Sequence, residues 1–205
     1  LWTVDHYYGG MLTSDADGAI PPPAGAPNIF AEWDDCTWPS SVDELRLWEF
    51  HVDWVTTANS TFGINGQPNQ VLNTQNVAIQ TQDIPQPGTT VRLDTLADRL
   101  MHRLQYRNYG THQALVTNHT VNAGSDRAGV HWWELRKTTG SWSIQNEGVH
   151  APADGKHRWM ASAALDASGN LALGYSISDG VSTYPSIAYA GRLATHPAMQ
   201  NPTIV

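Results

Sequence analysis

Two arginines in the middle of the chain have a spacing that suits the recognition of an anion. Arg103 and Arg107 flank Gln105 at alternate positions, so all three side chains share one face of the strand that this segment predicts. A guanidinium group binds a carboxylate through paired hydrogen bonds, so this face could hold an acidic sugar or another carboxylate. The alternative is that the two arginines pair with acidic side chains of an adjacent blade, the repeating unit described below.

Trp132 is a third candidate ligand-binding residue. Trp132 and Trp133 are adjacent in a predicted strand, so their rings point to opposite faces of the sheet. At most one ring can be an exposed platform on which a sugar stacks, and the other ring packs in the core. The sequence therefore favours a glycan or a protein as the ligand, with Arg103, Arg107 and Trp132 as its contacts.

The segment Asp15-Ala16-Asp17-Gly18 offers alternating carboxylates before a turn glycine, as the first half of a calcium loop does. A complete twelve-residue loop does not follow, because three prolines occupy positions 21 to 23. Asp15 and Asp17 are therefore candidate calcium ligands, and an ordinary hairpin turn is the alternative. Calcium is the one cofactor that the sequence suggests.

No catalytic residue can be assigned from the sequence. Glu49 and Glu134 each follow a tryptophan at equivalent positions of a repeat, and two carboxylates are what a glycosidase needs. Residues repeated at one place in successive units usually maintain the unit itself, so a structural role is the expectation. Six histidines between positions 102 and 157 lack the spacing of a zinc motif.

Two sequons and one cysteine complete the candidate modification sites. Asn59 and Asn118 each begin an Asn-x-Thr/Ser triplet, which matters only in a glycosylating secretory route. Cys36 is the single cysteine of the chain and has no partner for an internal disulfide.

A repeat with a period of 59 residues indicates which elements position these side chains. The segments 99–110 and 158–169 both begin with arginine, alternate in the same register and place a glycine eleven residues after the arginine. Further strands are expected at 113–121, 129–136 and 141–148, which gives four strands in about fifty residues. Such a unit is typical of a β-propeller blade.

The repeat divides the chain into four parts of one all-β domain. Residues 1–54 would form one or more partial blades with an acidic bias, and residues 55–97 a long insertion rich in Asn, Gln, Thr and Pro. Residues 98–150 would form a complete blade, and residues 151–205 a further blade that lacks its last strand, followed by a tail. The expected fold is thus a set of four-stranded antiparallel propeller blades.

The length of 205 residues allows about three to four blades of this size, and propellers close with about four to eight. We therefore expect an incomplete ring that other blades complete, from the same or another polypeptide, because an open ring would expose an apolar face. The first residues, Leu1-Trp2-Thr3-Val4, have the pattern of the interior of a folded unit and fit this expectation.

Composition and charge exclude some classes of function. The net charge is −8, and ten of the nineteen acidic residues lie in residues 1–53, beside a single arginine. Nucleic acid is an unsuitable partner, since its phosphates require clustered lysine and arginine. No segment has the apolar length of a membrane span. Only two lysines occur among abundant Asn, Thr, Ser and Gly, which is typical of exported proteins.

The segments DRLMHRLQYRNYG, LVTNHTV, GVHWWELR and HRWMASAALDASGNLALGYS, together with the segment YPSIAYAGRLA, resemble a family of large bacterial exported β-propeller proteins over residues 27–196. That family is similar in architecture to sialidase-like propellers, although the sialidase aspartate box and arginine triad have no match here. The resemblance implies a secreted or surface-attached location within a longer polypeptide or assembly.

The function predicted from the sequence is a structural or binding role in a larger extracellular protein or assembly, without catalysis. Two alternatives stay open. One is a carbohydrate-active enzyme, a hydrolase or lyase, whose site is shared with the missing blades. The other is a calcium-stabilised structural module.

Overall fold

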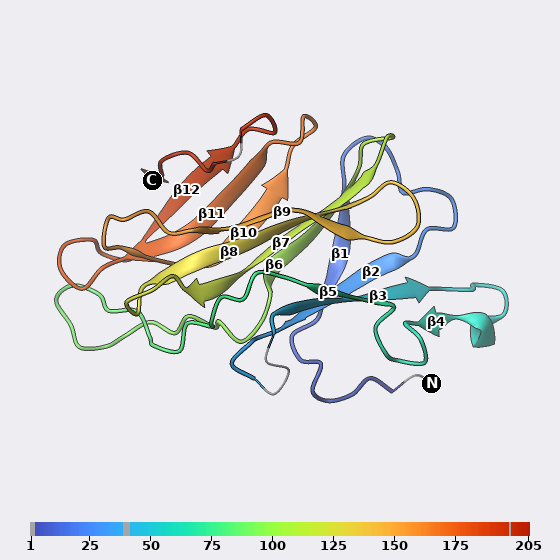
Figure 1. The fold of residues 1–205 in the computed structure, drawn as a ribbon, viewed down its shortest axis with the longest axis horizontal. Helices are drawn as coiled ribbons and strands as arrows, with labels where there is room; N and C mark the ends of the chain where they lie inside the picture. The colour runs from blue at the N-terminus through green and yellow to red at the C-terminus, as the bar shows by residue number, and fades with distance from the viewer. Residues whose placement is uncertain (1–2, 39–41, 197) are drawn as a thin grey trace.

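The computed structural model describes residues 3–38, 42–196 and 198–205, and its regular structure is almost entirely β. The all-β prediction is confirmed. The strands form two sheets, which lie one over the other in part of the molecule (Figure 1). The strands are β1 (Leu12–Asp17), β2 (Asn28–Asp34), β3 (Glu44–His51), β4 (Thr61–Phe62), β5 (Gln70–Asn73), β6 (Met101–Asn108), β7 (Gln113–Asn122), β8 (Ala128–Lys137), β9 (Ser143–His150), β10 (His157–Leu165), β11 (Leu171–Ser178), β12 (Ser186–Arg192) and β13 (Thr203–Ile204), and the one short 3-10 helix is η1 (Thr57–Asn59).

The larger sheet has nine strands in the order β4-β3-β2-β1-β6-β7-β8-β9, with β5 also paired to β3. All neighbours are antiparallel except β1 and β6, which run parallel with Ser14 opposite Leu104 and Asp17 opposite Arg107. This sheet curls, so that β2 and β3 lie behind β7 and β8. The smaller sheet has the simple order β10-β11-β12-β13 and covers the other side of β7 and β8.

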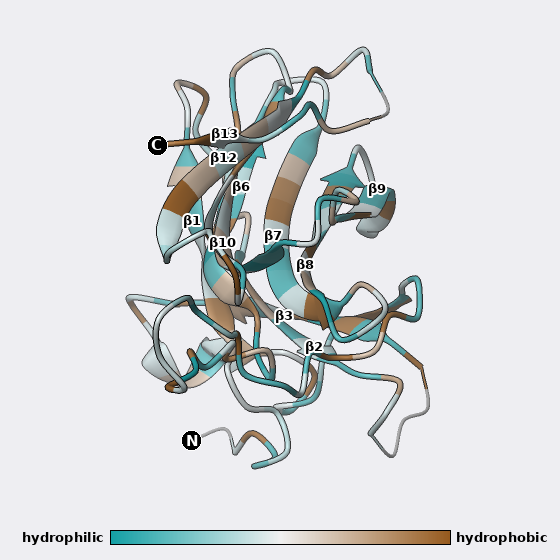
Figure 2. Cartoon of the chain, turned by 90° about the vertical axis from the view of Figure 1, so that its left-hand side faces the viewer, coloured by the Kyte–Doolittle hydropathy of each residue, from teal (hydrophilic) through white to brown (hydrophobic). Residues whose placement is uncertain are grey.

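Two hydrophobic cores explain this arrangement. One lies between the sheets, where Val116 and Trp132 of the larger sheet meet Leu173, Tyr175 and other residues of the smaller one. The other lies inside the curl of the larger sheet, where β2 and β3 pack against β6, β7 and β8. The middle strands β7 and β8 are therefore buried on both faces and contribute hydrophobic residues to both cores. In Figure 2, where the ribbon is coloured by hydropathy, brown segments of hydrophobic residues recur along the strands.

The repeat is visible as two successive four-stranded antiparallel meanders, β6–β9 and β10–β13. In the second, Trp159, Ala161, Ala163 and Leu165 are all buried, as the alternation predicts. In the first, Leu100, Leu104 and Tyr106 are buried but His102 is exposed, because the β6–β7 register shifts between Met101 and Gln105.

The prediction of separate four-stranded propeller blades is wrong. The parallel backbone pairing of β1 with β6 joins the first strands to the β6–β9 meander in one continuous sheet. The expectation that the last unit lacks its final strand is also wrong, since β13 pairs with β12. The β1–β9 strands form one curled sheet and not an open ring of blades, so the fold gives no reason to expect further blades that complete a ring.

The segment 55–97, which the sequence predicts to be a long insertion, contains regular secondary structure. Its first part forms η1, β4 and β5, and its second part crosses one end of both sheets, where Ile79 pairs with Val121 and Ile84 with Leu93. Ile84 is fully buried. No helix among the described residues has the length and hydrophobicity of a membrane span.

Candidate functional site

A pocket of about 500 Å³ opens at the end of the sheets that the 79–97 segment crosses. Three parts of the chain line it: Pro85 and Arg92 of that segment, the 123–127 turn between β7 and β8, and Gly155 and His157 at the beginning of β10. Residues as far apart in the sequence as Pro85 and His157 thus line one pocket.

The 123–127 turn has an unusual backbone. Gly124, Ser125 and Asp126 have φ angles of +97°, +55° and +57°, and the left-handed conformation costs about 1–2 kcal/mol for a residue other than glycine. The backbone N–H of Ala123 donates to the carbonyl of Arg127 at 2.8 Å, the N–H of Arg127 donates to the carbonyl of Gly124 at 3.2 Å, and the amide of Gln80 donates to the Asp126 carboxylate at 2.9 Å. These hydrogen bonds hold the turn in a strained shape, a feature common at binding sites.

The polar groups of the pocket are mostly hydrogen-bond donors. Arg92 is exposed and uses Nη1 to donate to the carbonyl of Asp83 at 3.0 Å. Arg127 donates through Nη2 to the carbonyl of Ala151 at 3.2 Å, and its buried Nε has no hydrogen-bond partner among the described residues. Since Nε of Arg127 is shielded from solvent, the N–H groups that a ligand could reach are the remaining ones on the terminal nitrogens of Arg127 and the free ones of the exposed Arg92.

His157 adds a neutral donor. Its Nδ1 accepts a hydrogen bond from the backbone N–H of Ala128 at 3.2 Å, so the hydrogen of the neutral ring lies on Nε2. Burial lowers the pKa of His157, and the nearby Arg127 and Arg92 lower it further, against the opposing effect of Asp126 and Asp179. The ring is therefore uncharged at neutral pH.

The sequence-predicted Arg103 and Arg107 lie elsewhere and are already engaged. Arg103 forms an ion pair with Asp17 of β1, with Nη2 and Oδ2 3.0 Å apart. Arg107 donates from Nε to the carbonyl of Leu165 at 3.1 Å. Arg103 thus pairs with an acidic residue, as in the alternative interpretation, but that residue lies on the neighbouring strand of the same sheet and not on an adjacent blade.

Trp132 is not an exposed platform. Its ring and that of Trp133 do point to opposite faces, but β2 and β3 cover one face and β10–β12 the other. Only 4% of Trp132 is exposed, and the Arg192 guanidinium lies 5.1 Å from the centre of its ring. A sugar could not stack on Trp132 without separating the sheets.

The candidate calcium ligands do not converge on an empty cavity. Asp15 and Asp17 are in β1, where the Asp17 carboxylate accepts hydrogen bonds from Arg103 and Gln105. These bonds lower the pKa of Asp17, with Gln105 as the larger influence, and the guanidinium stands where a cation would bind. The two aspartates are therefore part of the β1–β6 contact.

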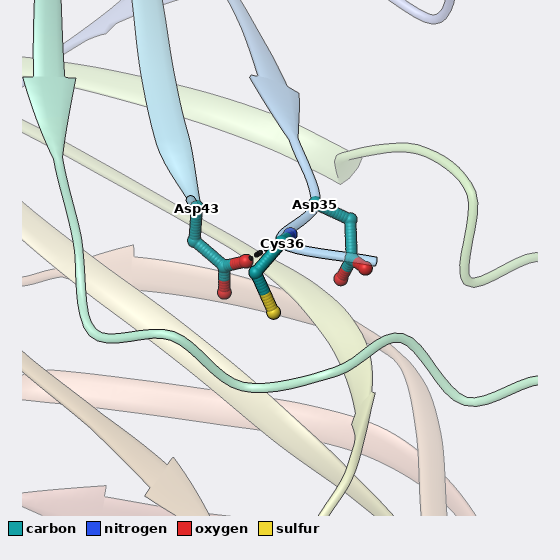
Figure 3. Close-up of side chains that lie close together, drawn as sticks. All are labelled: Asp35, Cys36 and Asp43. Carbon is teal, nitrogen blue, oxygen red and sulfur yellow. Dashed lines mark hydrogen bonds between the residues drawn. The ribbon is translucent and has the colours of Figure 1, made fainter. Parts of the chain in front are cut away.

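Asp35, Cys36 and Asp43 form the one group of potential metal ligands that the described residues bring within 4.8 Å of one another (Figure 3). The carboxylate oxygens of the two aspartates accept hydrogen bonds from backbone N–H groups. Asp43 accepts from the N–H groups of Cys36 and Val77 at 2.6 and 2.8 Å, and Asp35 from those of Thr37 and Ile79 at 2.8 and 2.9 Å. Burial and the nearby carboxylates raise the pKa of the Cys36 thiol to about 11. The group fixes the 77–79 segment to the β2–β3 connection.

The two sequons differ in accessibility. Asn59 is exposed at the end of η1. Asn118 is fully buried in β7, so a glycosyltransferase cannot reach it in the folded protein.

The two glutamates that could have formed a glycosidase pair are both bound to cations. Glu134 is 1% exposed and accepts from Arg192 at 2.8 Å, from Arg136 at 2.8 Å and from Asn146 at 2.9 Å. Glu49 lies 3.6 Å from the Lys137 ammonium. These contacts support the structural role that their equivalent positions suggest.

Sequence reasoning did not find the pocket. The Gly124-Ser125-Asp126 run marks a turn, but nothing in it shows that Arg92 and His157 lie beside it. Comparisons of the chain with protein-family models, with curated proteins and with solved structures find no match. The resemblance to exported propeller proteins therefore stays a prediction, and the function must be argued from the site.

Proposed function

We propose that this protein is a non-catalytic binding module whose ligand occupies the pocket formed by Arg92, the 123–127 turn and His157. The observation that carries the proposal is the convergence of three hydrogen-bond donors from distant parts of the chain on one open cavity. The strained turn is built on buried strands, so the donors are held in place before the ligand arrives, which lowers the cost of binding.

A binding role is favoured over catalysis by the chemistry of the lining residues. Asp126 is the only acidic residue that lines the pocket, and Gln80 holds its carboxylate. His157 has its Nδ1 bound to a backbone N–H, so it is not a free base. A hydrolase or lyase of sugars needs an acid and a base aimed at one bond, and this lining supplies neither.

The experiment that tests the proposal is binding to an array of neutral, uronic-acid and sulfated glycans, since a secreted or cell-surface location is the setting that the composition suggests. The Ser125→Trp variant places a large ring at the exposed tip of the turn and should abolish binding. Ser168→Trp is the control, because Ser168 lies in the turn at the opposite end of β10, about 30 Å away. Melting temperatures establish that both variants fold.

Binding that survives Ser125→Trp, or the absence of any bound glycan, would contradict the proposal. Equal loss in both variants would also contradict it, because the effect would then not belong to the pocket.

A second proposal is a role in a larger assembly, favoured by the outer face of the smaller sheet. Ile187 and Tyr189 of β12 are 66% and 53% exposed there, and Tyr189 has the uncharged Gly174 and Thr203 as its cross-strand neighbours. Uncharged sheet faces with exposed large side chains are typical of interfaces. The mass of the native particle tests this: a complex that Ile187→Arg dissociates would support it, and a particle of 22.5 kDa would contradict it.

A further inference from the structure

We propose that the pocket binds a small oxyanion group, a carboxylate, sulfate or phosphate, and that Arg92, Arg127 and the Nε2–H of His157 hold it. This inference rests on the proposed binding function and assigns the chemical class of the ligand.

The charge of the pocket lining favours an anion as the ligand. The protein carries a net charge of −8, yet the lining of the pocket has two arginines against one aspartate. A cationic cavity in an acidic protein concentrates anions at that point while the rest of the surface repels them. A cation or a metal ion would meet two guanidinium groups.

The carboxylates near the pocket, Asp126 and Asp179, accept hydrogen bonds from groups other than the two arginines. Asp126 accepts a hydrogen bond from Gln80, and Oδ1 of Asp179 accepts three backbone N–H bonds from residues 181–183 at 2.6 to 2.9 Å. Neither carboxylate forms an ion pair with Arg92 or Arg127 within 4 Å. The half-buried Arg127 thus lacks an anionic partner, and the exposed Arg92 is not neutralised by either carboxylate.

The donors of Arg92, Arg127 and His157 come from different walls of the pocket, which suits a ligand group with several oxygens. Nε of Arg127 is shielded from solvent and Nη2 donates to Ala151, so Arg127 can offer a ligand only the remaining N–H groups of its terminal nitrogens. The exposed Arg92 offers the N–H groups that its one bond to Asp83 leaves free. His157 contributes an N–H from another wall of the pocket, with its tautomer set by the Ala128 N–H. An oxyanion satisfies all of these donors together, whereas one sugar hydroxyl has a single oxygen to offer.

The test is a titration of the ¹⁵N-labelled protein, followed by NMR, at constant ionic strength in chloride. The probes are sodium glucuronate, sodium phosphate and sodium sulfate, with glucose as the neutral comparison. We expect the anions to shift the amide signals of residues 124–127 with saturation, and glucose to leave them in place. Glucuronate alone would identify a sugar carboxylate as the source, and phosphate or sulfate alone an inorganic or ester group. Each of these results supports the assignment of an oxyanion.

Matched variants separate a built site from general screening. Arg92→Gln should weaken anion binding at least tenfold, the scale of one charge-assisted hydrogen bond. Arg92 is exposed and makes one backbone contact, so the variant should fold. Lys137→Gln removes the same charge about 30 Å away at the other end of β8 and should have no effect.

The inference is overturned if glucose shifts the same signals, if no probe shifts them, or if Lys137→Gln weakens binding as much as Arg92→Gln. It fails separately from the proposed function. A neutral glycan that Ser125→Trp blocks would leave the binding module intact and remove the oxyanion. Anion shifts without any bound glycan on the array would keep the oxyanion and exclude a glycan as the molecule that carries it.

Discussion

At the scale of single residues, three of the acidic side chains in the first third of the chain surround one cation, Arg46. Arg46 lies 3.4 Å from Glu32, 2.6 Å from Asp34 and 2.9 Å from Glu44, and the Tyr8 ring covers it. Burial of Glu32, only partly offset by Arg46, raises its pKa to about 8. The folded protein therefore keeps a proton on Glu32 at neutral pH.

This raised pKa predicts a pH-dependent cost. Glu32 ionises near pH 4.5 in the unfolded chain and near pH 8 in the folded one, so its contribution to the free energy of unfolding falls as the pH rises from 4.5 to 8. Glu32→Gln should be more stable than the wild type at pH 9, by up to about 5 kcal/mol, and similar at pH 4. Urea unfolding at the two pH values measures this. An equal difference at both would contradict it.

His119 gives the opposite dependence. It is fully buried, its ring centre is 5.5 Å from that of His131, and burial followed by the His131 charge holds the pKa of His119 well below the usual value. The folded state resists protonation, so stability is complete above about pH 6.5 and falls as the pH decreases. His119→Phe should lose less stability between pH 7 and pH 5 than the wild type, by about 1–2 kcal/mol. Identical losses in urea unfolding would show that His119 does not contribute.

At the scale of elements, one buried ion pair connects the two sheets. Glu134 of β8 and Arg192 of β12 are 2.8 Å apart, and their side chains are almost fully buried. Arg192→Met leaves the buried Glu134 carboxylate with Arg136 as its one cationic partner and should cost about 3 kcal/mol. Adding Glu134→Gln to Arg192→Met should recover part of this loss, because a neutral amide costs less to bury than a carboxylate that has lost its buried partner. A double variant less stable than the single one in urea unfolding would contradict this account of the contact.

The local elements could be predicted from the sequence, whereas their packing could not. The alternation in 99–110 and 158–169 predicts β6 and β10, and the opposite orientations of Trp132 and Trp133 are confirmed. The burial of Trp133 depends on the parallel β1–β6 pairing, which places β2 and β3 behind β8, whereas the smaller sheet buries Trp132. That pairing joins residues about ninety positions apart, and no local pattern encodes it.

At the scale of the whole molecule, the candidate site belongs to no single element. The sequence drew attention to Arg103 and Arg107 because they share a strand face, but the partners that satisfy them, Asp17 and the Leu165 carbonyl, come from distant strands. Arg92, Arg127 and His157 carry no shared spacing and meet only because the 79–97 segment crosses the end of both sheets. Unsatisfied donors become visible only once the packing is known.

The most direct test of the central claim is a crystal structure grown without sulfate or phosphate and then soaked in selenate, whose selenium gives an anomalous signal. The account predicts one anomalous peak in the pocket, within hydrogen-bond distance of Arg127 and Arg92, and its loss in crystals of Arg92→Gln. Selenate bound only outside the pocket, or equally strong in the variant, would contradict an anion-binding function for this site.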